Sequence, residues 1–181
     1  MLTLFFSITF ILSCKKNEVA APASPVSTEE QNTEIAAGIR ARVNESYFSS
    51  TVNRTDTITS QPAPFYATYG SDSTSLIILG DGNINQQDSV SWAQMLLWVT
   101  RFNGEDTYPI EDGSSLAVFS VVDTLHNLRQ FISSGSPNGS VIINQFDTVN
   151  NTISGSFEFT ALSNDSVVII KNGVFNSVKI N

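Results

Sequence analysis

Hydrophobic and polar residues alternate along the C-terminal third of the chain. One parity of residues 153–161 carries only apolar or small side chains, namely Ile153, Gly155, Phe157, Phe159 and Ala161. The other parity is polar, and this period of two is typical of an antiparallel strand that is buried on one face. A second β-rich run, residues 141–146, precedes it, with turn-forming Asp and Asn residues between the two. The pattern predicts a β-hairpin.

Short β-rich runs separated by turn residues continue through the rest of the chain from about residue 37. The expected strands are residues 39–43, 47–52, 65–69, 75–79, 91–102, 116–122, 125–132, 141–146, 153–161, 167–171 and 174–180. This spacing predicts an all-β fold, a single antiparallel β-sandwich or partly open β-barrel domain at residues 37–181. Near-helical spacing within residues 121–132 permits a helix there, but β-branched neighbours favour extended chain.

Three dipeptides indicate where the chain turns. Asn172-Gly173 separates two β-rich runs, and Asn-Gly readily adopts the positive φ angles of a two-residue type I′ hairpin. Asp81-Gly82 and Asp112-Gly113 are expected to act in the same way.

The composition and the charge of the chain reduce the number of function classes that it fits. Charged residues make up 14% of the chain, against about 25% in average proteins. The formal net charge is −8, and the nine basic residues are scattered, which excludes nucleic acid as an expected partner. An acidic surface suits a protein that must stay soluble outside the cytoplasm.

The N-terminus carries a targeting pattern. Residues 1–13 are nearly all apolar, too short to span a bilayer and typical of a signal peptide, while residues 14–36 have the composition of a flexible linker. Residues 11–14, Ile-Leu-Ser-Cys, resemble the bacterial lipobox, which implies cleavage before Cys14 and lipidation of its thiol. We expect a membrane anchor at Cys14 and a location in the cell envelope, at the outer membrane. The alternative is a short buried segment with an incidental cysteine.

The sequence offers only weak indications of a catalytic or a metal-binding site. His126 is the only histidine and is expected to be an ordinary strand or turn residue. Residues 81–88 superficially resemble a calcium loop but lack its glycine and its glutamate, so we expect a turn, no metal site and no cofactor. A hydrolase that uses carboxylates such as Glu111 and Glu158 is the third-ranked hypothesis, and the domain is expected to be non-catalytic.

Trp92 and Trp98 are the best candidates for ligand binding. They share one parity of the same run and would emerge on one sheet face, where they could stack sugars. The opposite parity is apolar as well, so the strand has two interpretations: binding tryptophans, or core tryptophans in a strand buried on both faces. The interpretation as core tryptophans is favoured.

A recurrent triplet of Asp, then Ser or Thr, then an apolar residue or Thr resembles the O-glycosylation sequon of Bacteroidota. The acceptor positions are Thr57, Ser73, Ser89, Thr124, Thr148 and Ser166. The same triplet also arises where Asp begins a turn and a β-branched residue opens the next strand, and both interpretations stay open.

The C-terminal third resembles an uncharacterised lipoprotein family of Bacteroidota. The resemblance lies in the Ile153–Phe157 segment, in the Asn172–Phe175 segment and in Phe146-Asp147, with Ile39–Asn44 and Thr107-Tyr108 also fitting. It implies a lipobox, a tether and one β-rich domain, without an activity. The leading hypothesis is an envelope lipoprotein acting in binding or surface structure. The alternative is a glycan- or lipid-binding accessory module, with a carbohydrate or an envelope protein as partner.

Overall fold

The computed structural model describes residues 37–51, 65–72, 74–85, 90–133 and 138–181, all within one compact unit, Thr33–Asn181. In this part of the chain every regular element is a β-strand, which confirms the all-β prediction. The strands are β1 (Gly38–Val43), β2 (Ser46–Thr51), β3 (Phe65–Tyr69), β4 (Leu76–Asn85), β5 (Val90–Val99), β6 (Asp106–Ile110), β7 (Leu116–Asp123), β8 (Leu128–Ile132), β9 (Gly139–Asp147), β10 (Thr152–Ser163) and β11 (Ser166–Lys179).

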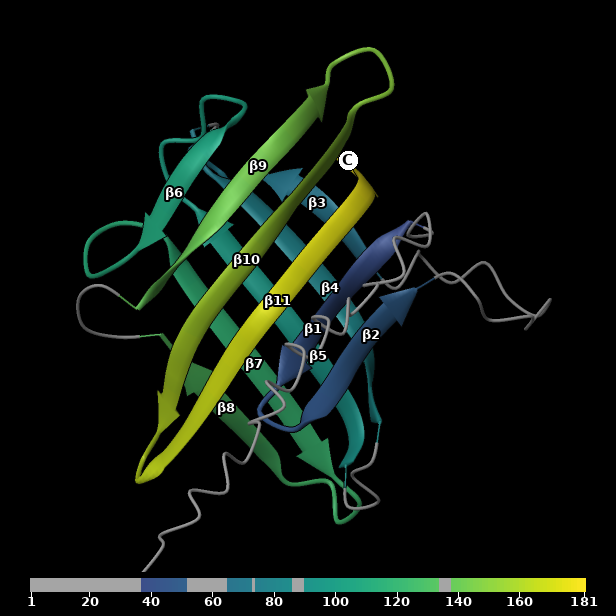
Figure 1. Cartoon of the computed structure of the whole chain (residues 1–181), viewed down its shortest axis with the longest axis vertical. Coiled ribbons are helices and arrows are strands. Elements are labelled where there is room, and N and C mark those ends of the chain that lie inside the picture. The colour runs from purple at the N-terminus through teal and green to yellow at the C-terminus, as the bar shows by residue number, and fades with distance from the viewer. Residues whose placement is uncertain (1–36, 52–64, 73, 86–89, 134–137) are drawn as a thin grey trace, which may run out of the picture. The chain divides into compact units, whose positions relative to one another are not determined.

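The strands form a closed antiparallel barrel. Successive pairings run from β11 through β1, β2, β4, β5, β7, β8 and β10, and β10 pairs with β11 again. In Figure 1, β1, β2 and β9 to β11 lie in front of β3, β4, β5, β7 and β8. Of the two architectures that the sequence left open, the structure has the barrel.

Three further strands pair alongside this ring. β9 pairs with β10, β6 pairs with β9, and β3 pairs with the first half of β4. The C-terminus joins β3 to the ring, because the Asn181 N–H donates to the Ala67 carbonyl at 2.9 Å.

Inward-facing side chains fill the barrel. The largest of those that are almost fully buried are Phe48, Phe119, Phe175, Ile39, Leu76, Ile78, Met95, Leu97, Ile110, Ile143, Ile153 and Ile170. Phe157 stacks between Phe159 and Phe175 at ring-centroid distances of 6.3 and 6.4 Å. Aromatic pairs of this kind add stabilisation beyond the area that they bury.

The predicted hairpin at the C-terminal third is confirmed. β9 and β10 pair antiparallel from Thr152↔Asp147 to Phe159↔Gly139. The predicted inward parity of β10 is buried throughout, and its opposite parity is more exposed. The Asp147 carboxylate accepts from the N–H groups of Val149 and Asn150, both at 2.9 Å, which orders the turn.

Two predicted turns are wrong. Asn172-Gly173 lies inside β11, where Gly173 pairs with Phe157 and the register shifts by one residue, so the dipeptide forms a β-bulge. Asn172 keeps the positive φ angle, 51°, that suggested a hairpin. Asp81-Gly82 lies inside β4, where a Cβ on Gly82 would meet the backbone carbonyl of Ser49. The turn at Asp112-Gly113 is confirmed, with φ of 77° at Gly113.

Other strand boundaries also differ. The runs 167–171 and 174–180 are one strand, β11, and β6 was not predicted at all. The residues 121–132 form the end of β7, a turn and β8, so the extended interpretation of that segment is confirmed over the helical one.

The outer face of the barrel carries an apolar row. Cross-strand pairs connect Tyr66, Leu79, Leu96, Val118, Ile132, Leu162 and Val167 in one continuous register across β3, β4, β5, β7, β8, β10 and β11. Ile132, Leu162 and Val167 are 43%, 43% and 53% exposed. The central strands are therefore apolar on both faces.

Candidate functional site

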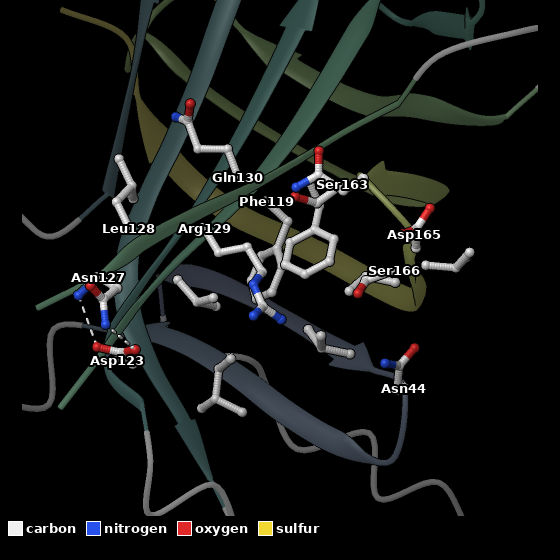
Figure 2. A pocket seen from close by; sticks show the side chains of 17 residues that line it. Asn44, Phe119, Asp123, Asn127, Leu128, Arg129, Gln130, Ser163, Asp165 and Ser166 are labelled. Atoms are coloured by element: carbon white, nitrogen blue, oxygen red, sulfur yellow. Dashed lines mark hydrogen bonds between the residues drawn. The ribbon is translucent and has the colours of Figure 1, made fainter. Parts of the chain in front are cut away.

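A cavity of about 840 Å³ opens at one mouth of the barrel, between the β1–β2, β7–β8 and β10–β11 turns. Figure 2 shows its lining, with the Asp123–Asn127 turn on one side and the Ser163–Ser166 turn on the other. The lining residues are Val43, Asn44, Ile84, Phe119, Val121, Asp123, Asn127, Leu128, Arg129, Gln130, Phe131, Ser163, Asn164, Asp165, Ser166, Val167 and Val168.

The cavity lies at the weakest seam of the barrel wall. A single residue pair, Leu162↔Ile132, joins β8 to β10, whereas β8 pairs with β7 over five residues. Residues 128–131 of β8 and residues 163–168 of the β10–β11 hairpin then line the cavity from opposite sides. The mouth is open at this point because the two strands do not continue their pairing.

The floor of the cavity is aromatic. Phe119 and Phe131 are 1% and 5% exposed, with ring centroids 6.3 Å apart. Phe48 packs edge-on against Phe119 at 6.3 Å, so the floor is continuous with the core. A ligand at the mouth would meet apolar ring edges below it.

Arg129 is the cation of this cavity. It has the same parity on β8 as the inward-facing Phe131 and pairs with Val121, so its side chain enters the mouth, as Figure 2 shows. No ion pair or hydrogen bond engages its guanidinium within the described part of the chain, where the one salt bridge is Arg42–Glu45. An arginine has five N–H donors in a planar fork that suits an anionic group.

The rim is ordered by side chain to backbone bonds. The Asp123 carboxylate accepts from the Asn127 amide at 2.9 Å and from the N–H groups of Asn127 and Leu125. These bonds, with the Asn127 side chain contributing most, lower the pKa of Asp123. On the opposite side, Asn44 Oδ1 accepts from the Ile169 N–H at 2.9 Å. The turns around the mouth are therefore held in place without a ligand.

This arrangement suits binding of a ligand that has an anionic group and an apolar body. Mouths of barrels are common ligand sites, in which a few polar groups fix orientation above an apolar lining. Within the described ranges, no cluster of three or more His, Cys, Asp or Glu side chains is suited to hold a metal ion. Those ranges also contain no helix of the length and apolarity needed to cross a membrane.

The structure places both tryptophans on the outer face of β5. Ala93, Met95, Leu97 and Val99 are the buried parity of this strand. Trp98 is 41% exposed, so its interpretation as a core residue is wrong; Trp92 is partly buried on the same outer face. Trp98, but not Trp92, lines a second and smaller surface pocket together with Glu111.

The structure does not bring the candidate catalytic residues together. Glu158 lies on the outer face of β10 and lines a different depression from Glu111. His126 is exposed in the β7–β8 turn with φ of 65°, and its N–H donates to the Asp123 carbonyl at 3.0 Å. The predicted position of His126 in a strand or turn is confirmed.

The predicted acceptor positions divide into two groups. Thr124, Thr148 and Ser166 are exposed at hairpin turns, and the preceding Asp123 and Asp147 do begin turns by accepting backbone N–H bonds. Thr57, Ser73, Ser89 and Cys14 lie outside the described residues. Modification of these side chains stays a prediction.

Sequence reasoning missed Arg129. The signal was its shared parity with Phe131 in the run Leu128–Ile132, which puts a cation on the inward face of a strand. That signal becomes informative only once β8 is known to line the mouth.

Comparison with protein families places most of the β domain in a family. The model of DUF6252, a domain of unknown function, matches residues 66–179. The matched segment starts in β3, so β1 and β2, which complete the ring, lie before it. Searches of curated proteins and of solved structures give no match.

Proposed function

The chain belongs to the DUF6252 family, whose function is unknown. We propose that it is an envelope protein with a lipid anchor, whose β domain binds an anionic, partly apolar ligand at the barrel mouth without converting it. The anchor is inferred from the sequence, and the binding from the geometry of the mouth. The observation that carries the proposal is Arg129: an arginine on the inward parity of a barrel strand, above an aromatic floor, with its guanidinium unengaged by other described residues. The lining also contains Asp123 and Asp165, and the chain has a net charge of −8, so the anionic group of the ligand would bind at the Arg129 guanidinium, the one basic side chain of this lining.

Anchoring is proposed from the N-terminal sequence. Residues 1–13 have the character of a signal peptide, and Cys14 follows as in a lipobox. Acyl chains on Cys14 would hold the protein at a membrane of the cell envelope, with the outer membrane as the proposed location. Residues 15–36 would then tether the β domain.

Ligand binding can be tested with two dyes of similar shape. 1-Anilinonaphthalene-8-sulfonate carries a negative charge, whereas N-phenyl-1-naphthylamine is uncharged. We expect saturable fluorescence enhancement with the sulfonate. Arg129→Gln should weaken its binding about tenfold or more, because a hydrogen bond to a charged group contributes roughly 1.5–3 kcal/mol. Binding of the uncharged dye should be unaffected.

The matched control is Arg101→Gln. Arg101 is an exposed arginine in the turn after β5, so this variant removes the same charge away from the cavity. It should bind both dyes like the unmodified protein. Equal sulfonate affinity in all three proteins would overturn the proposed site, since dye bound to the outer apolar row would not sense Arg129.

Anchoring is tested separately in the native host. Growth with an alkyne-tagged palmitate should label the wild-type protein, and Cys14→Ser should abolish the label. The intact mass of the mature protein should correspond to a chain that starts at Cys14 and carries acyl groups. An unlabelled wild-type protein that retains residues 1–13 would contradict the anchor but would leave the dye experiment unaffected.

A further inference from the structure

A second pocket of about 250 Å³ lies on the outer wall, where β5, the start of β7 and the β6–β7 turn meet. It shares no lining residue with the barrel mouth. Its lining combines one aromatic ring, two carboxylates and several hydroxyls. The residues are Trp98, Thr100, Glu111, Asp112, Gly113, Ser114, Ser115, Leu116 and Ser133.

Trp98 supplies a flat apolar platform. Its side chain is 41% exposed, a large fraction for a tryptophan on a paired central strand. Its cross-strand partners are Ile77 on β4 and Leu116 on β7. Directly opposed side chains on neighbouring strands are about 5 Å apart at Cβ, so these two residues lie on either side of Trp98 across the sheet.

Glu111 supplies an acceptor beside the ring. Glu111 is partly buried and directly follows β6, at the start of the turn that leads to β7. Among the described residues, nothing donates to its carboxylate or pairs with it, whereas Ser114 N–H donates to its backbone carbonyl at 3.0 Å and orders the turn. The hydroxyls of Ser115 and Ser133 accept from the N–H groups of Thr100 and Ala117, at 3.3 and 2.9 Å. The walls of the pocket are thus fixed, and the Glu111 carboxylate is available.

We propose that this pocket binds one neutral pyranose unit of an oligosaccharide. The C–H face of a pyranose is weakly positive and packs on the negative face of an indole ring, while ring hydroxyls donate to a carboxylate at the edge. A pocket of about 250 Å³ has room for about one sugar ring. Two carboxylates on an acidic protein repel uronic acids and sulfated sugars.

An organic cation is the competing ligand class, since carboxylates and an aromatic ring also attract ammonium groups. Such sites usually enclose the cation with several aromatic side chains. Trp98 is the single aromatic residue in the lining of this pocket, and it is flanked by aliphatic side chains. The geometry therefore favours stacking on one face over enclosure.

The two tryptophans of the chain make a matched test. Trp92→Phe leaves Trp98 as the sole indole fluorophore, and Trp98→Phe leaves Trp92. Both variants are titrated with neutral β-linked hexaoses of glucose, of xylose and of N-acetylglucosamine, with an oligogalacturonate, and with choline. We expect a saturable change in the emission of the Trp92→Phe protein with at least one neutral oligosaccharide, and none with the Trp98→Phe protein.

Glu111→Gln keeps the shape of the side chain and removes its charge. It should weaken binding about tenfold, because charge-assisted hydrogen bonds are roughly twice as strong as neutral ones. Coincident thermal melts of the variants and the wild type show that folding is intact. The proposal is overturned if no neutral oligosaccharide changes Trp98 emission, if Trp92 responds equally, or if choline or the oligogalacturonate binds more tightly.

Discussion

At the scale of single residues, Gly173 decides how β10 and β11 pack. It lies opposite Phe157, and a Cβ added at Gly173 would lie 2.5 Å from the ring. The ring cannot move away, because Phe157 is 3% exposed and stacks on both Phe159 and Phe175. The glycine is therefore required by the ring that covers it, and not by a turn.

We expect Gly173→Ala to destabilise the domain by about 1–3 kcal/mol, the usual cost of overpacking a core. Urea unfolding followed by circular dichroism measures this. In a Phe157→Leu background the same substitution should cost clearly less, since the clash is with the aromatic ring. If Gly173→Ala lowers the free energy of unfolding equally in the two backgrounds, a clash with the Phe157 ring does not explain why glycine is needed at position 173.

At the scale of elements, aspartates fix the turns. Asp72, Asp123 and Asp147 each accept backbone N–H bonds from residues two to four positions ahead. At Asp72 the Ser75 hydroxyl and the Thr74 N–H lower the pKa of the carboxyl group from 3.8 to about 2. The pKa of Asp147 is lowered as well, by the N–H and the side chain of Asn150.

A carboxyl group whose pKa is lower in the folded state stabilises that state above its unfolded pKa, and the stabilisation is lost on acidification. For Asp72 the window runs from about pH 4 down to about pH 2. Asp72→Asn retains an acceptor oxygen but has no charge, so we expect it to be less stable than wild type at pH 7, with a difference that shrinks as the pH falls from about 4 through about 2. Urea unfolding at a series of pH values tests this; a difference that does not change with pH would contradict it.

At the scale of the whole molecule, β11 closes the barrel. It pairs with β10 on one side and with β1, about as far away in the sequence as the domain allows, on the other. The ring therefore cannot close until the last strand is present. Contacts this distant in sequence also make folding slow, because loop closure must precede them.

Deletion of residues 166–181 should abolish cooperative folding. The deletion leaves one edge of β1 and one edge of β10 unpaired and removes Ile170, Phe175 and Val178 from the core. We expect no thermal transition in the near-ultraviolet circular dichroism of this variant. Deletion of Asn181 alone, which removes one bond to Ala67, should retain the transition. A cooperative melt of the longer deletion would refute the role of β11.

Periodicity predicted strands well where only one face is apolar. The β9–β10 hairpin was placed correctly because Phe157 and Phe159 alternate with Ser156 and Glu158. Periodicity misled at β5, where the apolar outer row makes both parities hydrophobic, so that Trp98 was favoured as core. β6 was missed because its exposed Thr107 and Pro109 give it too little apolar character.

By itself the sequence determined the strand-forming character of the chain, most strand positions and the inward parity of β10, because these follow from local alternation of side chains. The tertiary structure alone decided that the ring closes, that Asn172-Gly173 is a bulge, and that Arg129 stands at an open mouth while Trp98 lies on the outer wall. Those outcomes depend on which strands become neighbours, and such pairings join residues far apart in the chain that no local pattern connects.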